Sequence, residues 1–446
     1  MGQKSRNPGQ LDLFDDWLVV ASPAPQATPE PAPTTEPLPP EIAATPVSVP
    51  NIDESRYHLA VELAAQLNSE GAITSAFLTQ TANRIFGGTQ SKGTYSPKDA
   101  YDAMEAAFNL HLLTTESGNW IDGSAGWAQA KAGELTARIL HLPTQTRRDP
   151  EMDEFQQFST PPALAFIANW VANIRPVDRM MEPSAGTGDL AVWSRIAGAD
   201  VVLNELAPRR HALLAQLFPD ATLFRENAEQ LDNVLPTDTI PTAIVMNPPF
   251  SSTAGRVHGQ RSTANGARHL EQALRRLADG GRLVAIVGQG MAHDRPAFRP
   301  WWREIEAKYN VRANVGIAGR EYAKYGTSFD NQILVIDKTG PTTRAVLTGH
   351  VAAVLELPAL LEDIRNDRKH LQRAPVESTS RGDFGEARDS IRPEPGTGRA
   401  GSDSRGARSE SIGDGNDPRA VPIASEAVGE SVHGNESDDG IGTRNA

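Results

Sequence analysis

The stretch MMEPSAGTGDLAVW, residues 180–193, decides the fold. An apolar run ends in Glu182, Gly186 and Gly188 follow, and apolar residues then return at helical spacing. This order predicts a buried strand, a tight turn, and a helix whose first N–H groups face a ligand at the turn. The spacing is neither the GxGxxG of dinucleotide sites nor the GK[ST] ending of a P-loop. Glu182 would repel a pyrophosphate but would suit an ammonium group, such as the one on S-adenosylmethionine.

Short apolar runs alternate with helical stretches on both sides of this turn. The runs are VDRMMEP, ADVVLNE, TAIVMNPPF, RLVAIVG and NQILVIDK, which begin at residues 177, 199, 242, 282 and 331. Runs that are apolar throughout indicate strands buried on both faces of a parallel sheet, with the helices as crossovers. The sequence therefore predicts an α/β protein with a doubly wound sheet.

Two of these runs end in residues suited to chemistry. Glu205 ends the second run, where an acidic side chain can bind the hydroxyls of a ribose. The third run ends in NPPF, residues 247–250, in which two prolines restrict the backbone and hold the Pro248 carbonyl in place. Asn247 contributes an amide to this motif, and Phe250 contributes an aromatic face.

Together these motifs resemble those of the amino-group DNA methyltransferases that use S-adenosylmethionine, in the order in which the cofactor loop precedes the catalytic tetrapeptide. The resemblance covers residues 158–338 and rests on EPSAGTG (182–188) and NPPF. FSTPPALAFIANW (158–170) is similar to the family segment before the first strand, and KYGTSFDNQILVIDK (324–338) to a late hairpin. The resemblance implies a Rossmann-like class I methyltransferase fold with an antiparallel last strand. More loosely, the chain resembles methylase-like proteins of plasmids and phages.

The resemblance also implies a site for S-adenosylmethionine as cofactor. Thr160 and Pro161 would contact its methionine part, and Asn227 stands where the family often has an acidic residue that binds the adenine. An amide can still pair with an adenine edge. The cofactor-binding residues carried over are Thr160, Pro161, Glu182, Pro183, Ala185, Gly186, Gly188, Glu205, Asn227 and Ala228.

The implied reaction is methyl transfer to an exocyclic amino group of a DNA base, with adenine N6 favoured over cytosine. The lone pair of that nitrogen is delocalised into the ring. The Asn247 side-chain oxygen and the Pro248 carbonyl would each accept one of its N–H bonds and turn the lone pair towards the methyl group. Phe250 would stack on a base flipped out of the duplex. The catalytic residues expected are Asn247, Pro248, Pro249 and Phe250.

Other functions remain open at this point. A protein-glutamine or RNA amino-methyltransferase would act on a nitrogen that is delocalised in the same way, and a non-catalytic methylase fold could bind DNA or act against restriction. The segment after NPPF favours DNA as the partner, because its arginines suit contacts with phosphates. These arginines are Arg256, Arg261, Arg268, Arg275 and Arg276.

The composition of the chain excludes several classes of site. The 446 residues carry a net charge of -13 and include no cysteine. The sequence therefore excludes disulfides, thiolate metal sites and the cysteine nucleophile needed for methylation at cytosine C5, and we identify no metal site. Since no apolar run reaches about 18 residues, we expect no membrane span and a cytoplasmic location.

The same composition divides the chain into segments. We expect residues 1–50 to be a disordered tail with a Pro-rich linker and residues 51–150 to be a helical domain for packing or substrate positioning. The resemblance implies that residues 151–345 are the methyltransferase domain. Ser96 and Pro97 form a plausible cap and first turn for one helix of the helical domain. We expect a C-terminal helix over 346–373 and a disordered acidic tail over 374–446.

The first tail contains one apolar motif, GQLDLFDDW at residues 9–17. Its residues Gln10, Leu11, Leu13 and Phe14 resemble the short peptide by which bacterial proteins bind the replication sliding clamp. The apolar side chains would then be buried in a partner protein, and the Pro-rich stretch would act as a tether that raises the local concentration of the enzyme on DNA.

We expect a peptide of residues 1–25 to bind a bacterial sliding clamp in a fluorescence-polarisation titration. A peptide with Leu13→Ala and Phe14→Ala should lose this binding, because it lacks the two side chains that fill the apolar groove. Equal binding by the two peptides, or binding by neither, would contradict the prediction.

Overall fold

The structure is a computed structural model that describes residues 51–69, 71–145, 159–249, 264–325 and 329–371. Several predictions made above fall outside these residues. They are the clamp motif at 10–14, the two tails, Phe250, and Arg256 and Arg261 of the basic segment. They stay predictions.

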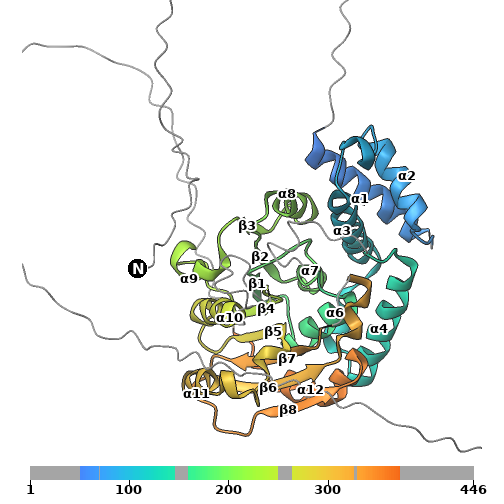
Figure 1. Cartoon of the computed structure of the whole chain (residues 1–446). Coiled ribbons are helices and arrows are strands. Elements are labelled where there is room, and N and C mark those ends of the chain that lie inside the picture. Colours follow the sequence, from blue (N-terminus) through green and yellow to red (C-terminus); the bar gives the residue numbers. More distant parts are fainter. Residues whose placement is uncertain (1–50, 70, 146–158, 250–263, 326–328, 372–446) are drawn as a thin grey trace, which may run out of the picture. The chain divides into compact units, whose positions relative to one another are not determined.

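One eight-stranded sheet organises the chain, in the order β3-β2-β1-β4-β5-β7-β6-β8 (Figure 1). All neighbouring strands are parallel except that β7 runs antiparallel to both β5 and β6. The predicted doubly wound sheet with a late antiparallel strand is therefore confirmed. The strands are β1 Arg179–Glu182, β2 Asp200–Asn204, β3 Thr222–Phe224, β4 Ala243–Met246, β5 Arg282–Gly288, β6 Asn310–Ile317, β7 Asn331–Asp337 and β8 Leu347–Val351.

Alternate strand residues are buried on opposite faces of the sheet. Met180 and Val245 belong to one apolar cluster, and their chain neighbours Met181 and Ile244 belong to a second. Helices cover both faces, which explains why the strand sequences are apolar throughout. These helices are α6 Pro162–Ala172, α7 Ala191–Ile196, α8 Pro208–Leu217, α9 Leu231–Val234, α10 Ala264–Arg276 and α11 Arg299–Lys308.

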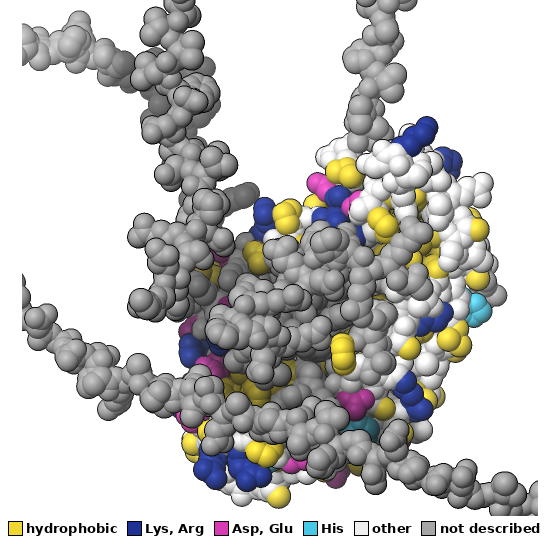
Figure 2. Space-filling view, in the orientation of Figure 1, with side chains coloured by type: hydrophobic (Ala, Val, Ile, Leu, Met, Phe, Trp, Pro, Cys, Tyr) yellow, Lys and Arg dark blue, Asp and Glu magenta, His cyan; other side chains and the backbone are white. Residues whose placement is uncertain are grey.

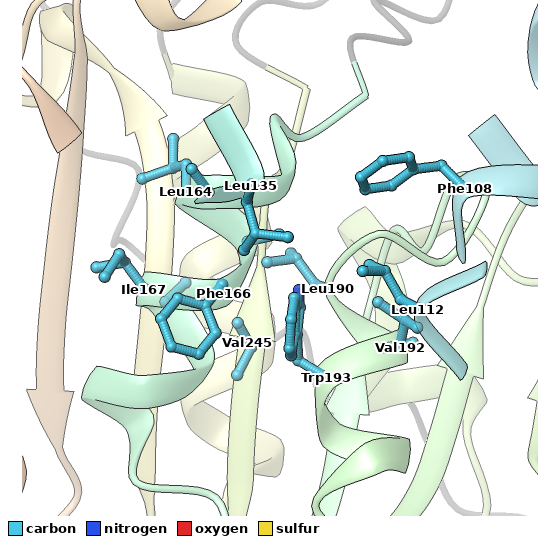
Figure 3. Packing of buried hydrophobic residues seen from close by; sticks show 14 of the residues in the cluster. Phe108, Leu112, Leu135, Leu164, Phe166, Ile167, Leu190, Val192, Trp193 and Val245 are labelled. Atoms are coloured by element: carbon cyan, nitrogen blue, oxygen red, sulfur yellow. The ribbon is translucent and has the colours of Figure 1, made fainter. Parts of the chain in front are cut away.

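The helices before the sheet share its first apolar cluster. Phe108 and Leu112 belong to the same cluster as Phe166 of α6 and Trp193 of α7 (Figure 3). The segment predicted as a helical domain therefore has no core separate from that of the sheet, and the boundary near residue 150 stays a prediction. The helices are α1 Ile52–Asn68, α2 Ser75–Ile85, α3 Pro97–Thr115 and α4 Ala125–Arg138.

The predicted start of α3 is confirmed. The Ser96 hydroxyl accepts a hydrogen bond from the Asp99 N–H at 3.2 Å, and the Asp99 carboxylate accepts one from the Ser96 N–H at 2.7 Å. With Pro97 in the first turn, this capping box sets both the start and the direction of the helix.

The prediction of a helix over 346–373 is wrong for the first half of that segment. Residues Leu347–Val351 form β8, which pairs with β6, and the helix α12 spans only Leu357–Asn366. Thr348 and Val351 are β-branched and suit an edge strand, whereas Pro358 suits the first turn of a helix. The apolar periodicity of the segment alone does not distinguish the strand from the helix.

Short 3-10 helices complete the described chain. They are η1 Gln90–Lys92, η2 Gly118–Asp122, η3 Ile139–His141, η4 Ala228–Gln230, η5 Gln289–Met291, η6 Pro296–Phe298, η7 Gly319–Tyr325 and η8 Val354–Glu356. None of the helices described is both long enough and apolar enough to cross a bilayer.

A buried ion pair attaches the end of the described chain to the sheet. Arg368 donates to Asp178 at 2.6 Å, and the two side chains are 2% and 0% exposed. Arg368 also donates to the carbonyl of Ala172 at the end of α6, at 2.7 Å. The segment after α12 is thereby fixed to the residue that precedes β1.

We expect Arg368→Met to lower the free energy of unfolding by about 3 kcal/mol or more, because it leaves the Asp178 carboxylate buried without its cation. Urea unfolding followed by circular dichroism measures this change. Arg84→Met is the matched control. It removes an exposed partner of Glu62 and should cost less than about 1 kcal/mol. Equal losses in the two variants would contradict the prediction.

Candidate active site

Three predicted site residues lie at one edge of the sheet. Glu182 ends β1, Glu205 follows β2 and Asn247 follows β4, and these strands are adjacent and parallel in the order β2-β1-β4 (Figure 1). The carboxyl ends of parallel strands form the crevice in which ligands bind in this fold class.

The cofactor loop, residues 183–190, requires both of its glycines. Gly186 and Gly188 have φ angles of +57° and +92°, which L side chains rarely adopt. A Cβ atom on Gly188 would also lie 2.5 Å from a ring carbon of Phe218. The backbone of the loop is therefore left-handed at both positions, and few residues other than glycine could occupy them.

The cofactor loop is bonded to the end of β2. The Gly186 N–H donates to Glu205 Oε2 at 2.8 Å, and the Ala185 N–H donates to the carbonyl of Asn204 at 2.9 Å. Glu205 Oε1 accepts from the Ala207 N–H at 2.8 Å. Burial raises the pKa of Glu205, and the nearby Arg210 opposes that shift. Each Glu205 oxygen has a second lone pair that can accept a hydrogen bond from a hydroxyl group.

Glu182 is the side chain whose environment best fits a cationic ligand. It is 2% exposed, and its Oε2 has no hydrogen-bond partner among the described residues. Burial raises the pKa of Glu182 well above its usual range, and the Asp189 carboxylate adds to the shift. An ammonium group beside this oxygen would supply the missing partner, so the residues present fit the cofactor predicted from the sequence.

Asp189 lies near the end of the cofactor loop and is not among the predicted site residues. Its Oδ2 accepts from the Thr160 N–H at 3.2 Å, and its Oδ1 accepts from Asn109 Nδ2 at 3.1 Å. Burial and the neighbouring carboxylate of Glu105 raise the pKa of Asp189 to about 7. Asp189 therefore joins the loop to the segment that precedes α6.

The same segment holds the predicted catalytic amide. Asn247 Nδ2 donates to Thr160 Oγ1 at 2.9 Å, which orients the plane of the amide. Tyr322 of η7 is buried against it. Burial raises the pKa of the Tyr322 hydroxyl far above its usual range, while hydrogen bonding with Asn247 opposes the shift. Pro248 is buried and Pro249 half-buried behind the amide.

Asn227 and Ala228 lie beyond β3, away from Asn247. Ala228 is buried, whereas Asn227 is exposed and its side-chain oxygen accepts from the Glu229 N–H at 3.0 Å. Asn227 thus caps η4, a role that the sequence analysis did not assign. Leu206, which follows Glu205, is 43% exposed and offers an apolar surface at the end of β2.

A pocket lies beside Asp189, between α3 and the start of α6. Its polar residues are Glu105, Gln145, Asp189, Lys324 and Tyr325, and its apolar residues are Met104, Phe108, Ile139, Leu142, Pro143 and Pro162. The pocket thus combines two carboxyl groups, Glu105 and Asp189, with the ammonium group of Lys324 between apolar walls. Pro162 follows the Thr160–Pro161 pair predicted to contact the methionine part of the cofactor.

Only some of the arginines in the basic segment after NPPF are exposed. Arg268 and Arg275 of α10 have exposed side chains that pair with Glu229 and Glu271. Arg276 is 7% exposed and donates to the carbonyl of Leu235 at 2.9 Å. The assignment of Arg276 to phosphate contacts is therefore wrong, because its guanidinium holds α9 against α10.

Hydrogen bonds join Asn247 to Thr160 and Thr160 to Asp189 of the cofactor loop. They also join Gly186 of the loop to Glu205, and Ala185 to the neighbour of Glu205. Glu182 is close enough to Asp189 for the Asp189 charge to raise its pKa. The sequence analysis missed Asn109, Asp189, Asn204 and Tyr322. Asn204 and Asp189 stand next to recognised motifs and could have been found there. Asn109 and Tyr322 carry no local signal.

Among solved structures, the chain is similar to a modification subunit of a putative type I restriction enzyme from Vibrio vulnificus YJ016, with a TM-score of 0.35 and 16% identity over 49% of this chain and 51% of that one. The chain thus spans about half the length of that protein. It is also similar to a putative class I S-adenosylmethionine-dependent methyltransferase from Listeria monocytogenes, with a TM-score of 0.41 and 13% identity over 71% of this chain and 99% of that one.

A third similar structure is a putative RNA methyltransferase from Pyrococcus horikoshii, with a TM-score of 0.34 and 17% identity over 47% of this chain and 96% of that one. Structural similarity at these identities and TM-scores does not indicate a substrate or a partner for this chain. No protein-family model matches the sequence, and no curated protein matches it.

The raised pKa of Asp189 predicts a pH dependence of stability. Between its usual value of 3.8 and about 7, the folded protein holds a proton on Asp189 that the unfolded chain has lost. The free energy of unfolding should therefore fall as pH rises through this window, by up to about 1.4 kcal/mol per pH unit. Asp189→Asn should remove that contribution.

Urea unfolding of wild type and Asp189→Asn over this pH range tests the prediction. The pKa of the buried His269 does not depend on Asp189, so its contribution is the same in both proteins and cancels in the difference. The part of the Glu182 shift that the Asp189 charge causes is removed together with that charge. Parallel pH profiles for the two proteins would show that Asp189 does not titrate there.

Proposed function

We propose that the chain is an S-adenosylmethionine-dependent methyltransferase that acts on the exocyclic amino group of a DNA base, with adenine N6 as the favoured acceptor. The observation that carries the proposal is the hydrogen-bonded path from Asn247 through Thr160 to Asp189 of the cofactor loop. It places the amide of the NPP motif beside a loop whose buried carboxylates suit a cation.

The residues of this chain would divide the work of the reaction. When bound, S-adenosylmethionine supplies a methyl group on a positively charged sulfur. Glu182 and Glu205 would hold the cofactor, Glu182 through its unpartnered oxygen and Glu205 through its remaining lone pairs. Gly186 and Gly188 would let the loop backbone lie close to it, since both have left-handed φ angles that disfavour a side chain and a Cβ atom on Gly188 would also clash with Phe218.

Asn247 and Pro248 would act on the acceptor nitrogen. The amide oxygen and the Pro248 carbonyl each accept one N–H, which removes the lone pair from conjugation with the ring and directs it at the methyl group. Thr160 orients the amide by accepting a hydrogen bond from its nitrogen. Phe250 keeps its proposed role in stacking on the flipped base.

The choice of DNA is supported by a group of exposed arginines on α11 and in the segment just before it. Arg295, Arg299 and Arg303 are exposed, and the last two lie one turn apart on α11. Figure 2 shows Lys and Arg side chains at the edge of the molecule where Figure 1 places α11. Met291 lies between α11 and the NPP motif. Trp302 of α11 donates a hydrogen bond to the Met291 carbonyl. The Met291 sulfur lies 3.1 Å from the position that a Cβ atom on Gly266 would occupy, and the Pro249 carbonyl lies near that same position.

Methylation-aware sequencing of DNA from cells that express the chain tests the proposal. We expect wild type to add a methyl group to adenine N6 in a defined sequence, and Asn247→Ala to lower the rate by about 10²–10³, the effect of removing one preorganised transition-state hydrogen bond. Cofactor affinity measured by calorimetry should change little. Asn310→Ala, an amide at the start of β6 that bonds to Thr339, is the control.

Three outcomes would contradict the proposal in different ways. Equal turnover by Asn247→Ala would reject the catalytic role of the amide. Methyl transfer to RNA or to a protein glutamine in place of DNA would correct the substrate. Binding of DNA without any methyl transfer would indicate a non-catalytic module.

A further inference from the structure

One face of α3 carries four buried polar side chains, and the first of them, Lys98, pairs with Asp102 at 2.8 Å. Asp102, Glu105 and Asn109 follow one another at intervals of three and four residues, so they share a face of the helix. Their exposed fractions are 0%, 5% and 2%. Buried polar groups destabilise a fold unless they are hydrogen-bonded, so the partners of these three side chains show what the face is for.

Asn109 and Glu105 bind the cofactor loop directly. Asn109 Nδ2 donates to the carbonyl of Thr187 at 3.0 Å and to Asp189 Oδ1 at 3.1 Å. Glu105 Oε2 accepts from the Thr187 hydroxyl at 2.9 Å and from the Ser159 hydroxyl at 2.6 Å. The last bond also attaches the residue that precedes Thr160.

Asp102 acts on the loop through Arg210 of α8. The guanidinium donates to Asp102 Oδ1 from Nε at 3.2 Å and from Nη2 at 3.1 Å, and Lys98 and Arg209 also pair with this carboxylate. Arg210 Nη1 lies 3.4 Å from the Cβ position of Gly186. The loop is thus held from the β2 side by Asn204 and Glu205, and from the opposite side by α3.

We propose that Asn109 and Glu105 are positioning residues for the cofactor loop, and that α3 makes the helical segment a part of the cofactor site. The inference rests on the proposed function for the identity of the ligand, but the support of the loop by α3 does not depend on that ligand.

Two other roles for this face fit the contacts less well. Apolar side chains such as Phe108 and Leu112 already pack α3 against the sheet cluster, so packing alone does not require four buried polar groups (Figure 3). Contact with DNA does not fit either, because the face is buried and carries two carboxylates against one lysine.

Hydrogen–deuterium exchange without any cofactor tests the support of the loop. In Asn109→Ala, the amides of residues 184–190 should exchange at least about tenfold faster than in wild type, since two bonds to the loop are lost. Amides of β5 should be unchanged. Glu105→Gln, which keeps the shape of the side chain, should increase exchange in the same residues by a smaller factor. Asn83→Ala, which removes an amide of α2 that bonds to Tyr95, should leave the loop unchanged.

Calorimetry and kinetics with S-adenosylmethionine give the second readout. We expect Asn109→Ala to weaken cofactor binding by about tenfold and to raise the cofactor KM, with kcat within about twofold of wild type. The KM effect should be absent in Asn83→Ala. A fall in kcat at unchanged cofactor KM would overturn the positioning role.

The outcomes separate this inference from the proposed function. Unchanged loop exchange in folded Asn109→Ala and Glu105→Gln would overturn the inference even if the enzyme methylates DNA. Faster loop exchange together with no binding of S-adenosylmethionine by wild type would support the inference and reject the proposed function. If Asn109→Ala does not fold, Glu105→Gln decides the question by the same two readouts.

Discussion

The hydrogen bond from the Gly186 N–H to the Glu205 carboxylate is the interaction on which the candidate site depends. At 2.8 Å it closes the turn after β1 onto the residue that follows β2. It can form only because β1 and β2 are parallel neighbours that end together, and because Gly186 adopts a left-handed conformation. The positions of Thr187, Gly188 and Asp189 follow from this closure, and so does the start of α7. Through Thr160, the same closure sets the orientation of Asn247.

The second constraint is electrostatic. Burial raises the pKa values of Glu182, Asp189 and Glu205, so the ionised forms of these carboxyl groups are less stable in the site than in water. Such an arrangement lowers the stability of the fold, and a cationic ligand that neutralises it gains affinity from the same groups. The positive charge of Arg210 opposes this rise in pKa at Asp189 and Glu205, because it favours their ionised forms. Arg210 is fixed by Asp102 at one end and faces Gly186 at the other.

Much of this arrangement could be predicted from local sequence. The apolar runs that contain β1, β2, β4, β5 and β7 indicate these strands, and the capping box at Ser96 can be recognised because its residues are contiguous.

Contacts between segments distant in the chain could not be predicted in this way. Asn109 and Asp189 are 80 residues apart, and nothing near Asn109 marks it as different from other polar residues of a helix. Arg276 was misassigned for the same reason, because a guanidinium that binds carbonyls of another helix has the same local sequence as one that binds phosphate. The β8 strand was missed because its pairing with β6, and not its own periodicity, determines its structure.

The central claim is that the carboxylates around the glycine turn bind the cation of S-adenosylmethionine. A calorimetric titration of S-adenosylmethionine into the full chain tests it most directly, with Glu182→Gln as the variant and the exposed Glu226→Gln as its control. The account predicts one site per chain in wild type and in Glu226→Gln, and an affinity at least about tenfold weaker in Glu182→Gln, because the amide removes the charge that pairs with the ligand. Absence of binding by wild type, or equal affinity in Glu182→Gln and wild type, would contradict the account.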